Sequence, residues 1–171
     1  MTARSGRKCL ETLLRENKAS LIRERWLADL SQATELQTSA LSLVDVETTV
    51  TLRKTFFQRI KSGSIDLHRY WPKENLADVL SFLSPLAREI GSEQVTLFSN
   101  VDQYLGAVQL PAGPVLRDIS RVWKAVGQDL SMTTGSGDDG ICLEENYYDS
   151  DGNYIREGIY ELSAWGLFVP R

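Results

Sequence analysis

The chain has 171 residues, of which 42% are hydrophobic and 25% are charged, and its formal net charge at pH 7 is −4. These proportions are typical of a globular protein, and the negative net charge argues against general binding to nucleic-acid backbones. No apolar run approaches the roughly 18 residues of a membrane span, so we expect no association with a membrane.

The first part of the chain shows helical periodicity. Apolar residues recur at helical spacing between charged ones over about residues 8–31, which predicts a first helix. A second helix is predicted to begin after Asp45, whose carboxylate can accept hydrogen bonds from free backbone amides. A third is predicted from Pro72 to Gly91, with a kink or break at Pro85 because proline removes a backbone donor.

After Gly91 the periodicity becomes that of strands, with one further helix predicted over 114–125. The strand-like segments are 94–98, 104–110, 129–133, 141–148 and 154–165. The resulting order is roughly ααα-ββ-α-βββ, which favours an α+β fold over a doubly wound sheet. We expect an N-terminal half of about three helices packed on a C-terminal antiparallel sheet. The length suits a single domain, 1–171, with candidate subdomains 1–91 and 92–171.

The cysteines and the N-terminus bear on location. Cys9 and Cys142 lie far apart and show no metal-ligand spacing, which is typical of a reduced cytoplasmic protein. The N-terminus is basic, but a polar amphipathic helix is predicted to follow it, so we expect no signal peptide. The expected localisation is therefore cytoplasmic.

Negative charge is concentrated in the C-terminal segment. Residues 129–171 contain nine acidic and two basic residues, so this segment carries −7 and the rest of the chain is net positive. Like charges brought together in paired strands destabilise a fold unless a partner compensates them. The acidic segment is therefore the best indication of function in the sequence.

The last two predicted strands flank the sequence Asp149-Ser-Asp-Gly-Asn153. Asp-Gly is a preferred pair for a two-residue type I′ turn, so we predict a β-hairpin that turns at Asp151 and Gly152. Counting from this turn gives the predicted cross-strand pairs: Tyr148 with Ile155, Asn146 with Glu157, Glu144 with Ile159, and Cys142 with Glu161.

This register places Glu144, Glu157 and Glu161 on one face of the hairpin, within diagonal reach of one another. The opposite face is more apolar and is expected to pack on the helices. The residues of that second face are Ile141, Leu143, Tyr147, Tyr154, Tyr160 and Leu162. Gly158 leaves a second register open, because a bulge at this glycine would shift later residues to the other face.

The acidic face is either a solvated surface or a recognition surface for a basic protein partner. Negative charge speeds association with a positive surface, and exposed tyrosines add contact area. The candidate partner-binding residues are Glu144, Asn146, Tyr148, Glu157, Glu161, Asp138 and Asp139.

A calcium-binding loop is a competing interpretation of the hairpin turn. The residues that match the first three ligand positions of an EF-hand loop are Asp149, Asp151 and Asn153. The required glycine would fall on Tyr154 and the required bidentate acid on Tyr160, so the segment indicates a turn instead. The chain has one histidine, His68, so a histidine-based metal site is not expected either.

No catalytic motif is evident in the sequence. Cys9 and His68 could form a nucleophile and a base, but the flanking residues give no support for this pairing. A catalytic carboxylate pair requires burial that raises the pKa of the general acid, which the exterior of a hairpin does not provide. We therefore predict no enzymatic activity, no cofactor and no metal.

The sequence Leu14-Arg-Glu-Asn-Lys-Ala-Ser-Leu-Ile-Arg-Glu-Arg-Trp-Leu27 resembles the opening helix of the N-terminal sensor domains of stressosome-type regulators. The resemblance covers some fourteen residues and implies an all-helical domain. The β-rich second half does not fit such a domain, so no function is taken from the resemblance.

We expect a cytoplasmic protein-binding module of the immunity or antitoxin type, by analogy with small acidic proteins that neutralise basic nuclease toxins. Its carboxylates would mimic phosphates and occlude the toxin's active site. One alternative is a regulatory or ligand-sensing domain with a pocket between the helices and the sheet, lined by Trp71 or Trp123. Another is an enzyme with two acids of raised pKa in one cleft. The sequence patterns identify neither the partner nor the oligomeric state.

Overall fold

The computed structural model describes residues 3–127, 129–148 and 152–170. The strands are β1 (Ser42–Leu43), β2 (Leu67–Pro72), β3 (Gln94–Leu97), β4 (Val108–Pro111), β5 (Leu130–Thr134), β6 (Gly140–Tyr148) and β7 (Tyr154–Trp165). The α-helices are α1 (Ala3–Thr34), α2 (Val46–Lys61), α3 (Leu76–Leu83), α4 (Leu86–Glu89), α5 (Asp102–Leu105), α6 (Ala112–Arg117) and α7 (Ile119–Val126). Short 3₁₀ helices are η1 (Thr38–Ala40), η2 (Lys73–Asn75) and η3 (Gly166–Phe168).

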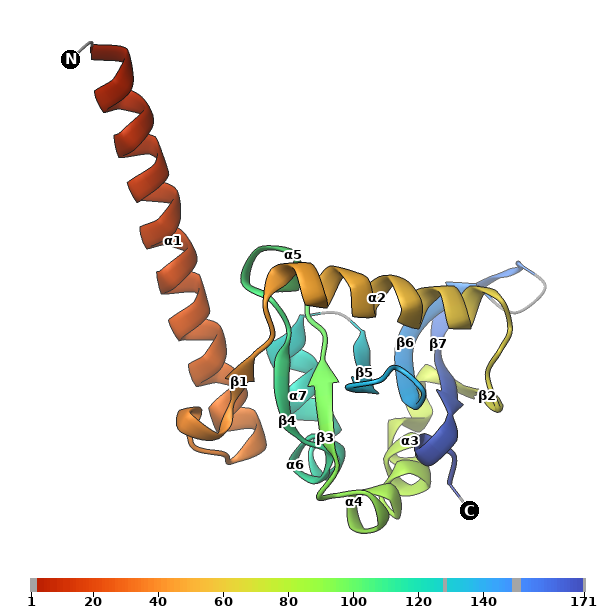
Figure 1. Cartoon of the computed structure of the whole chain (residues 1–171). Helices are drawn as coiled ribbons and strands as arrows, with labels where there is room; N and C mark the ends of the chain where they lie inside the picture. The colour runs from red at the N-terminus through yellow and green to blue at the C-terminus, as the bar shows by residue number, and fades with distance from the viewer. Residues whose placement is uncertain (1–2, 128, 149–151, 171) are drawn as a thin grey trace.

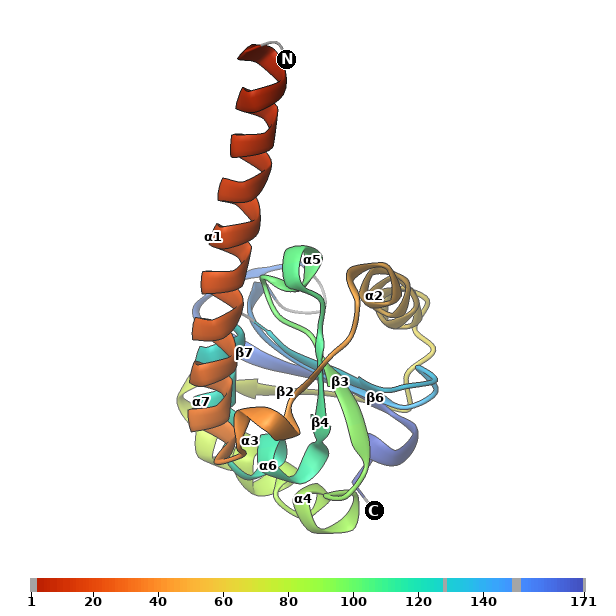
Figure 2. The same ribbon diagram turned by 60° about the vertical axis from the view of Figure 1, so that its left-hand side comes forward.

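The strands described here form one antiparallel sheet in the order β1-β4-β3-β5-β6-β7-β2. Helix α2 lies on one face of this sheet, and the other α-helices that pack on it lie on the opposite face (Figure 2). The predicted α+β fold is therefore confirmed. The two edge strands, β1 and β2, come from the first part of the chain, so early and late segments share one sheet.

Helix α1 is longer than predicted, and its first turns stand away from the rest of the molecule (Figure 1). Its C-terminal part packs on α7 and buries Trp26, Leu30 and Ala33. Leu21, by contrast, is 67% exposed. None of the helices among the described residues is both long and apolar enough to cross a membrane.

Helix α2 begins where the sequence predicts. The Asp45 carboxylate accepts a hydrogen bond from the backbone N–H of Thr48 at 2.8 Å, which satisfies one of the free amides of the first turn. The helix then buries Phe56 against the rings of Phe98 and Trp165. These contacts cover one part of the sheet face on which Cys142 also lies.

The main core lies on the opposite face of the sheet. It is formed by aliphatic side chains of β3 to β7 together with one side of α1, α3, α4, α6 and α7. Its members include Leu30, Val79, Leu83, Leu86, Val122, Leu130, Ile141, Leu143 and Leu162. The prediction that the apolar face of the last hairpin packs on the helices is confirmed for Ile141, Leu143, Tyr160 and Leu162. Tyr147 and Tyr154, which were expected on the same face, are exposed instead.

The helix predicted from Pro72 starts too early. Residues 67–72 form the edge strand β2, which pairs with β7 from Leu67 opposite Ala164 to Pro72 opposite Ile159. Pairing with a distant strand overrides the local helix signal, and proline is tolerated at the end of an edge strand. The predicted break at Pro85 is confirmed, because this residue separates α3 from α4.

Two further elements differ from the prediction. The strand expected over 104–110 is wrong in its first half, where α5 forms and ends at Gly106 with a φ of +83°. The strand itself, β4, begins at Val108. The helix expected over 114–125 is two helices, α6 and α7, because the Asp118 side chain caps a new helix by accepting from the N–H of Arg121.

The pairing of the β6–β7 hairpin also differs. Glu144 lies opposite Glu161 and Cys142 opposite Ser163, so the predicted register is wrong by two residues. The reason is an irregularity between Asn146 and Tyr148, across from Gly158, which has a φ of +76°. Tyr148 pairs with Tyr154, not with Ile155, and the predicted turn residue Asp151 lies outside the described residues. An irregularity at Gly158 thus sets the register, but it moves the pairing by two residues, so the later residues stay on their predicted face instead of changing face.

A glycine beneath Trp165 gives a test of the sheet packing. A Cβ at position 140 would lie 2.4 Å from the buried Trp165 ring, so we expect Gly140→Ala to lower the free energy of unfolding by about 2 kcal/mol. A Cβ at position 135 would contact nothing within 4 Å, so Gly135→Ala serves as the matched control. Urea denaturation measures both, and equal stabilities would contradict the packing described here.

Candidate functional site

Three carboxylates define what we call the acidic face: Asp129, Glu144 and Glu161. Glu144 and Glu161 are direct cross-strand neighbours, which brings their Cβ atoms to about 5 Å. Asp129 immediately precedes Leu130, which pairs with Leu143, so the register brings it beside Glu144. Like charges directly opposite one another are destabilising in a sheet. Two of the three glutamates predicted to gather, Glu144 and Glu161, are therefore neighbours, and Asp129 joins them in place of Glu157.

The acidic face is partly withdrawn from water. Burial raises the pKa of Glu144, and the negative charge of Asp129 raises it further. Burial also raises the pKa of Asp129, although the nearby Arg53 acts in the opposite direction. Among the described residues, no lysine or arginine forms a salt bridge with either carboxylate. At neutral pH the ionised forms of both carboxylates thus lower the stability of the folded protein.

Glu161 is better compensated than the other two. Its Oε1 lies 2.7 Å from His68 Nε2, and its Oε2 accepts a hydrogen bond from Asn146 Nδ2 at 3.1 Å. The His68 ring in turn packs on Tyr70, with centroids 4.7 Å apart. Edge strand β2 therefore supplies the one histidine of the chain as a partner for the acidic face.

Glu145, the next residue along β6, lies in the opposite environment. It forms a salt bridge with Lys73 and accepts a hydrogen bond from the Tyr147 hydroxyl at 2.9 Å. The Lys73 ammonium lowers the pKa of Glu145. Two consecutive glutamates thus have pKa values shifted in opposite directions, because alternate residues of a strand point to opposite faces.

The remaining predicted site residues divide into two groups. Asn146, Tyr148 and Glu157 lie on the same hairpin as the acidic face, and Tyr148 is 54% exposed with its ring 5.8 Å from that of Tyr154. Asp138 and Asp139 precede the other end of β6, whose first residue, Gly140, lies about 13 Å along the strand from Glu144.

Asp139 is tied into the fold. One oxygen of its carboxylate accepts from the backbone N–H of Leu167 at 2.9 Å, and the other accepts from the Thr134 hydroxyl at 3.2 Å. The Asp138 carbonyl accepts from Arg59 at 3.2 Å. The structure thus does not bring these two aspartates together with the glutamates.

The site offers limited chemistry. Within the described ranges, no group of three or more His, Cys, Asp or Glu residues is placed to hold a metal ion. Cys142 is buried, and burial raises the pKa of its thiol, which lies 3.1 Å from the Ser131 hydroxyl. Such a thiol is a poor nucleophile. The raised pKa values of Asp129 and Glu144 are one feature that a carboxylate-pair enzyme would need, and that alternative stays a prediction.

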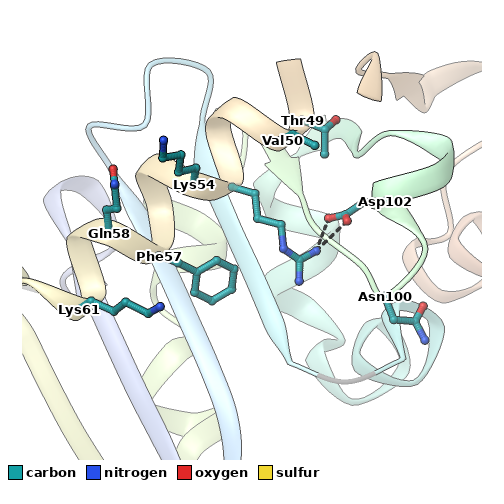
Figure 3. A pocket seen from close by; sticks show the side chains of 9 residues that line it. Thr49, Val50, Lys54, Phe57, Gln58, Lys61, Asn100 and Asp102 are labelled. Atoms are coloured by element: carbon teal, nitrogen blue, oxygen red, sulfur yellow. Dashed lines mark hydrogen bonds and ion pairs between the residues drawn. The ribbon is translucent and has the colours of Figure 1, made fainter. Parts of the chain in front are cut away.

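A second feature is a groove of about 750 Å³ along α2, which we call the α2 groove (Figure 3). Its lining residues are Thr49, Val50, Arg53, Lys54, Phe57, Gln58, Lys61, Asn100 and Asp102. Helix α2 forms one wall, and the other side is formed by Asn100, which lies between β3 and α5, and by Asp102, the first residue of α5. The sequence predicts the helix, but the groove was not predicted. The sequence feature that could have indicated it is the helical spacing of residues 50, 54, 57 and 61, which places them on one side of α2.

The tryptophans expected to line a pocket lie elsewhere. Trp71 is buried in the main core, with its ring centroid 5.4 Å from that of Phe82. Trp123 is partly buried and lines a separate hollow of about 560 Å³ beside Asp129 and Glu145. The α2 groove contains neither of them.

Comparisons of the chain with protein-family models, with curated proteins and with solved structures found no match. Function is therefore argued from the geometry of the chain itself.

Proposed function

We propose that the protein is a binding module whose acidic face docks onto a basic protein partner. The observation that carries the proposal is the like-charged group of Asp129, Glu144 and Glu161, with which no lysine or arginine of the described residues forms a salt bridge. A partner's lysine or arginine would relieve the repulsion within this group. Binding would thus remove a repulsion that destabilises the free protein.

The hairpin beside the acidic face supplies contact area. Tyr148 and Tyr154 are 54% and 65% exposed, and their rings contact each other at the end of the hairpin. Tyrosine is enriched in protein interfaces because it combines a large apolar ring with a hydroxyl group. The exposed Glu157 lies on the same hairpin and would contribute to long-range steering.

The specific form of this proposal is an immunity or antitoxin-type protein. In that role the carboxylates would occupy the cationic active site of a basic nuclease toxin in place of phosphates. The support is the small size and acidic charge of the chain, together with the acidic face. The ligand-sensing alternative is supported by the α2 groove, which lies between α2 and the residues that follow β3.

The test compares two variants of equal net charge. We expect Glu144→Gln, Glu157→Gln and Glu161→Gln together to slow association with a basic partner isolated from the host by about tenfold at low salt. The same three changes should also flatten the salt dependence of the association rate.

The matched control is Glu24→Gln, Glu89→Gln and Glu93→Gln, which removes three exposed acids from α1, α4 and the turn after α4. Surface plasmon resonance at several salt concentrations gives the association rates. If the two triple variants bind with the same kinetics, the acidic face is not the interface.

A further inference from the structure

We infer that the α2 groove binds a small organic anion: a carboxylate or phosphate group joined to an aromatic or other apolar body. This site adjoins the acidic face, because Arg53 lies near Asp129, but its inferred ligand is distinct from the proposed basic protein partner. Three features of the groove favour such a ligand: a positioned arginine, an excess of positive charge, and an aromatic ring partway along it.

Arg53 is the positioned arginine. Its Nη1 donates to both carboxylate oxygens of Asp102, at 2.7 and 2.6 Å, and to the Ser99 carbonyl at 3.0 Å. The Asp102 side chain is only 1% exposed, whereas that of Arg53 is 40% exposed. A buried carboxylate thus fixes one nitrogen of the guanidinium. The other N–H groups make no hydrogen bond within the described part of the chain and can donate to a ligand.

The charge of the groove favours an anion. Its lining contains three cations, Arg53, Lys54 and Lys61, against the single carboxylate of Asp102. Asp129 lies near Arg53 just outside this lining, so the positive charge exceeds the negative charge even when it is counted. Neither lysine forms a salt bridge among the residues that the structure describes. Arg53 and Lys61 are eight residues apart on α2, which places them about 12 Å apart along the helix axis. An anionic group can therefore bind at either end of the groove.

Phe57 supplies the surface that would contact the apolar body of the ligand. It lies between Arg53 and Lys61 on the same helix, and the Arg53 guanidinium lies 5.4 Å from its ring centroid. Its edge-to-face contact with Phe56, at 5.2 Å, holds the ring in place. Val50, which is 53% exposed, adds apolar surface at the other end. The groove volume of about 750 Å³ lies in the usual range for small-molecule sites.

The test uses phenyl phosphate as the probe and the full chain labelled with ¹⁵N. We expect it to bind with a Kd of about 1 mM or tighter and to shift amide signals of α2 and of residues 99–102. Inorganic phosphate lacks the ring and phenol lacks the charge, so each should bind about tenfold more weakly or not at all. Benzoate, titrated in parallel, distinguishes a preference for carboxylate from one for phosphate.

Variants that keep the fold locate the binding. Lys61→Gln should weaken the binding of phenyl phosphate about threefold, and Phe57→Leu about fivefold. Lys124→Gln, on α7 and outside the groove, should leave it unchanged. The triple variant Glu144→Gln, Glu157→Gln and Glu161→Gln should also leave it unchanged, so failure of this site and failure of the proposed function are distinguishable.

Three results would overturn the inference. The first is the absence of shifts on α2 at about 10 mM phenyl phosphate, and the second is equal affinity of Lys61→Gln and Lys124→Gln. The third is binding of an acidic peptide in the groove without binding of either aromatic anion, which would assign the groove to a protein segment. If Phe57→Leu unfolds, as thermal melting would show, the Lys61→Gln comparison decides alone.

Discussion

Replacing Arg53 with methionine is expected to lower the free energy of unfolding by about 3 kcal/mol. The substitution leaves the Asp102 carboxylate, which is 1% exposed, without its cation. The backbone N–H of Ser99, at 3.3 Å, would be its remaining donor among the hydrogen bonds described above. A buried charge that loses its partner costs several kcal/mol. The figure is at the lower end of that range because Arg53 itself is 40% exposed to solvent.

A double-mutant cycle separates this pair from general effects on α2. Asp102→Asn removes the charge but keeps the shape, so the double variant Arg53→Met with Asp102→Asn should regain most of the lost stability. Lys54→Met, at the next position of the helix, removes a cation without a salt bridge and should change stability by less than about 0.5 kcal/mol. Urea denaturation gives all four values. Strictly additive losses for Arg53 and Asp102 would show that the two residues are not coupled.

Local signals in the sequence were sufficient for much of the fold. Asp45 marks the start of α2, Pro85 divides α3 from α4, and the strand boundaries of β7 match the predicted segment 154–165. These signals act within a few residues: a side chain caps a helix, a ring removes a donor, and alternation marks a strand. The fold class follows from them.

Pairing between distant strands could not be predicted from such local signals. Strand β2 forms because Leu67 to Pro72 meet β7, which lies about ninety residues later in the chain. Its sequence contains Pro72 and precedes an apolar helical pattern, so the local signal favours a helix. The register of the last hairpin depends on the conformation of Gly158, and a shift of two residues there keeps every later side chain on its predicted face. Glu144 and Glu161 therefore lie together even though the predicted pairs are wrong.

The candidate sites show the same division. Glu144 and Glu161 belong to neighbouring strands joined by a short connection, so their proximity could be counted from the sequence. Asp129 and His68 reach the acidic face from β5 and β2, and only the strand order places them there. Arg53 and Asp102 are 49 residues apart, and no spacing rule links them. Sites assembled from distant elements require the tertiary structure.

The acidic face makes the stability of the protein depend on pH. Glu144→Gln is expected to raise the free energy of unfolding at pH 7 by roughly 0.5–1 kcal/mol, the size of a like-charge cross-strand interaction. The folded state raises the pKa of Glu144, mainly through burial and then through the charge of Asp129. Stability from this group is complete below its pKa in the unfolded chain, about 4.3, and is lost as the pH rises through the higher pKa of the folded state.

The gain from Glu144→Gln should therefore be small near pH 4 and should increase toward neutral pH. Glu145→Gln is the matched control, because Lys73 lowers the pKa of Glu145 and the sign is reversed. The stabilisation from Glu145 is present above its unfolded pKa and is lost as the pH falls through the folded value, so this variant should be less stable than the native protein at pH 7. Thermal melts of both variants between pH 4 and 8 measure these differences. A loss of stability in Glu144→Gln at pH 7 would mean that Glu144 is compensated in the free protein, and the reason to propose a basic partner for the acidic face would disappear.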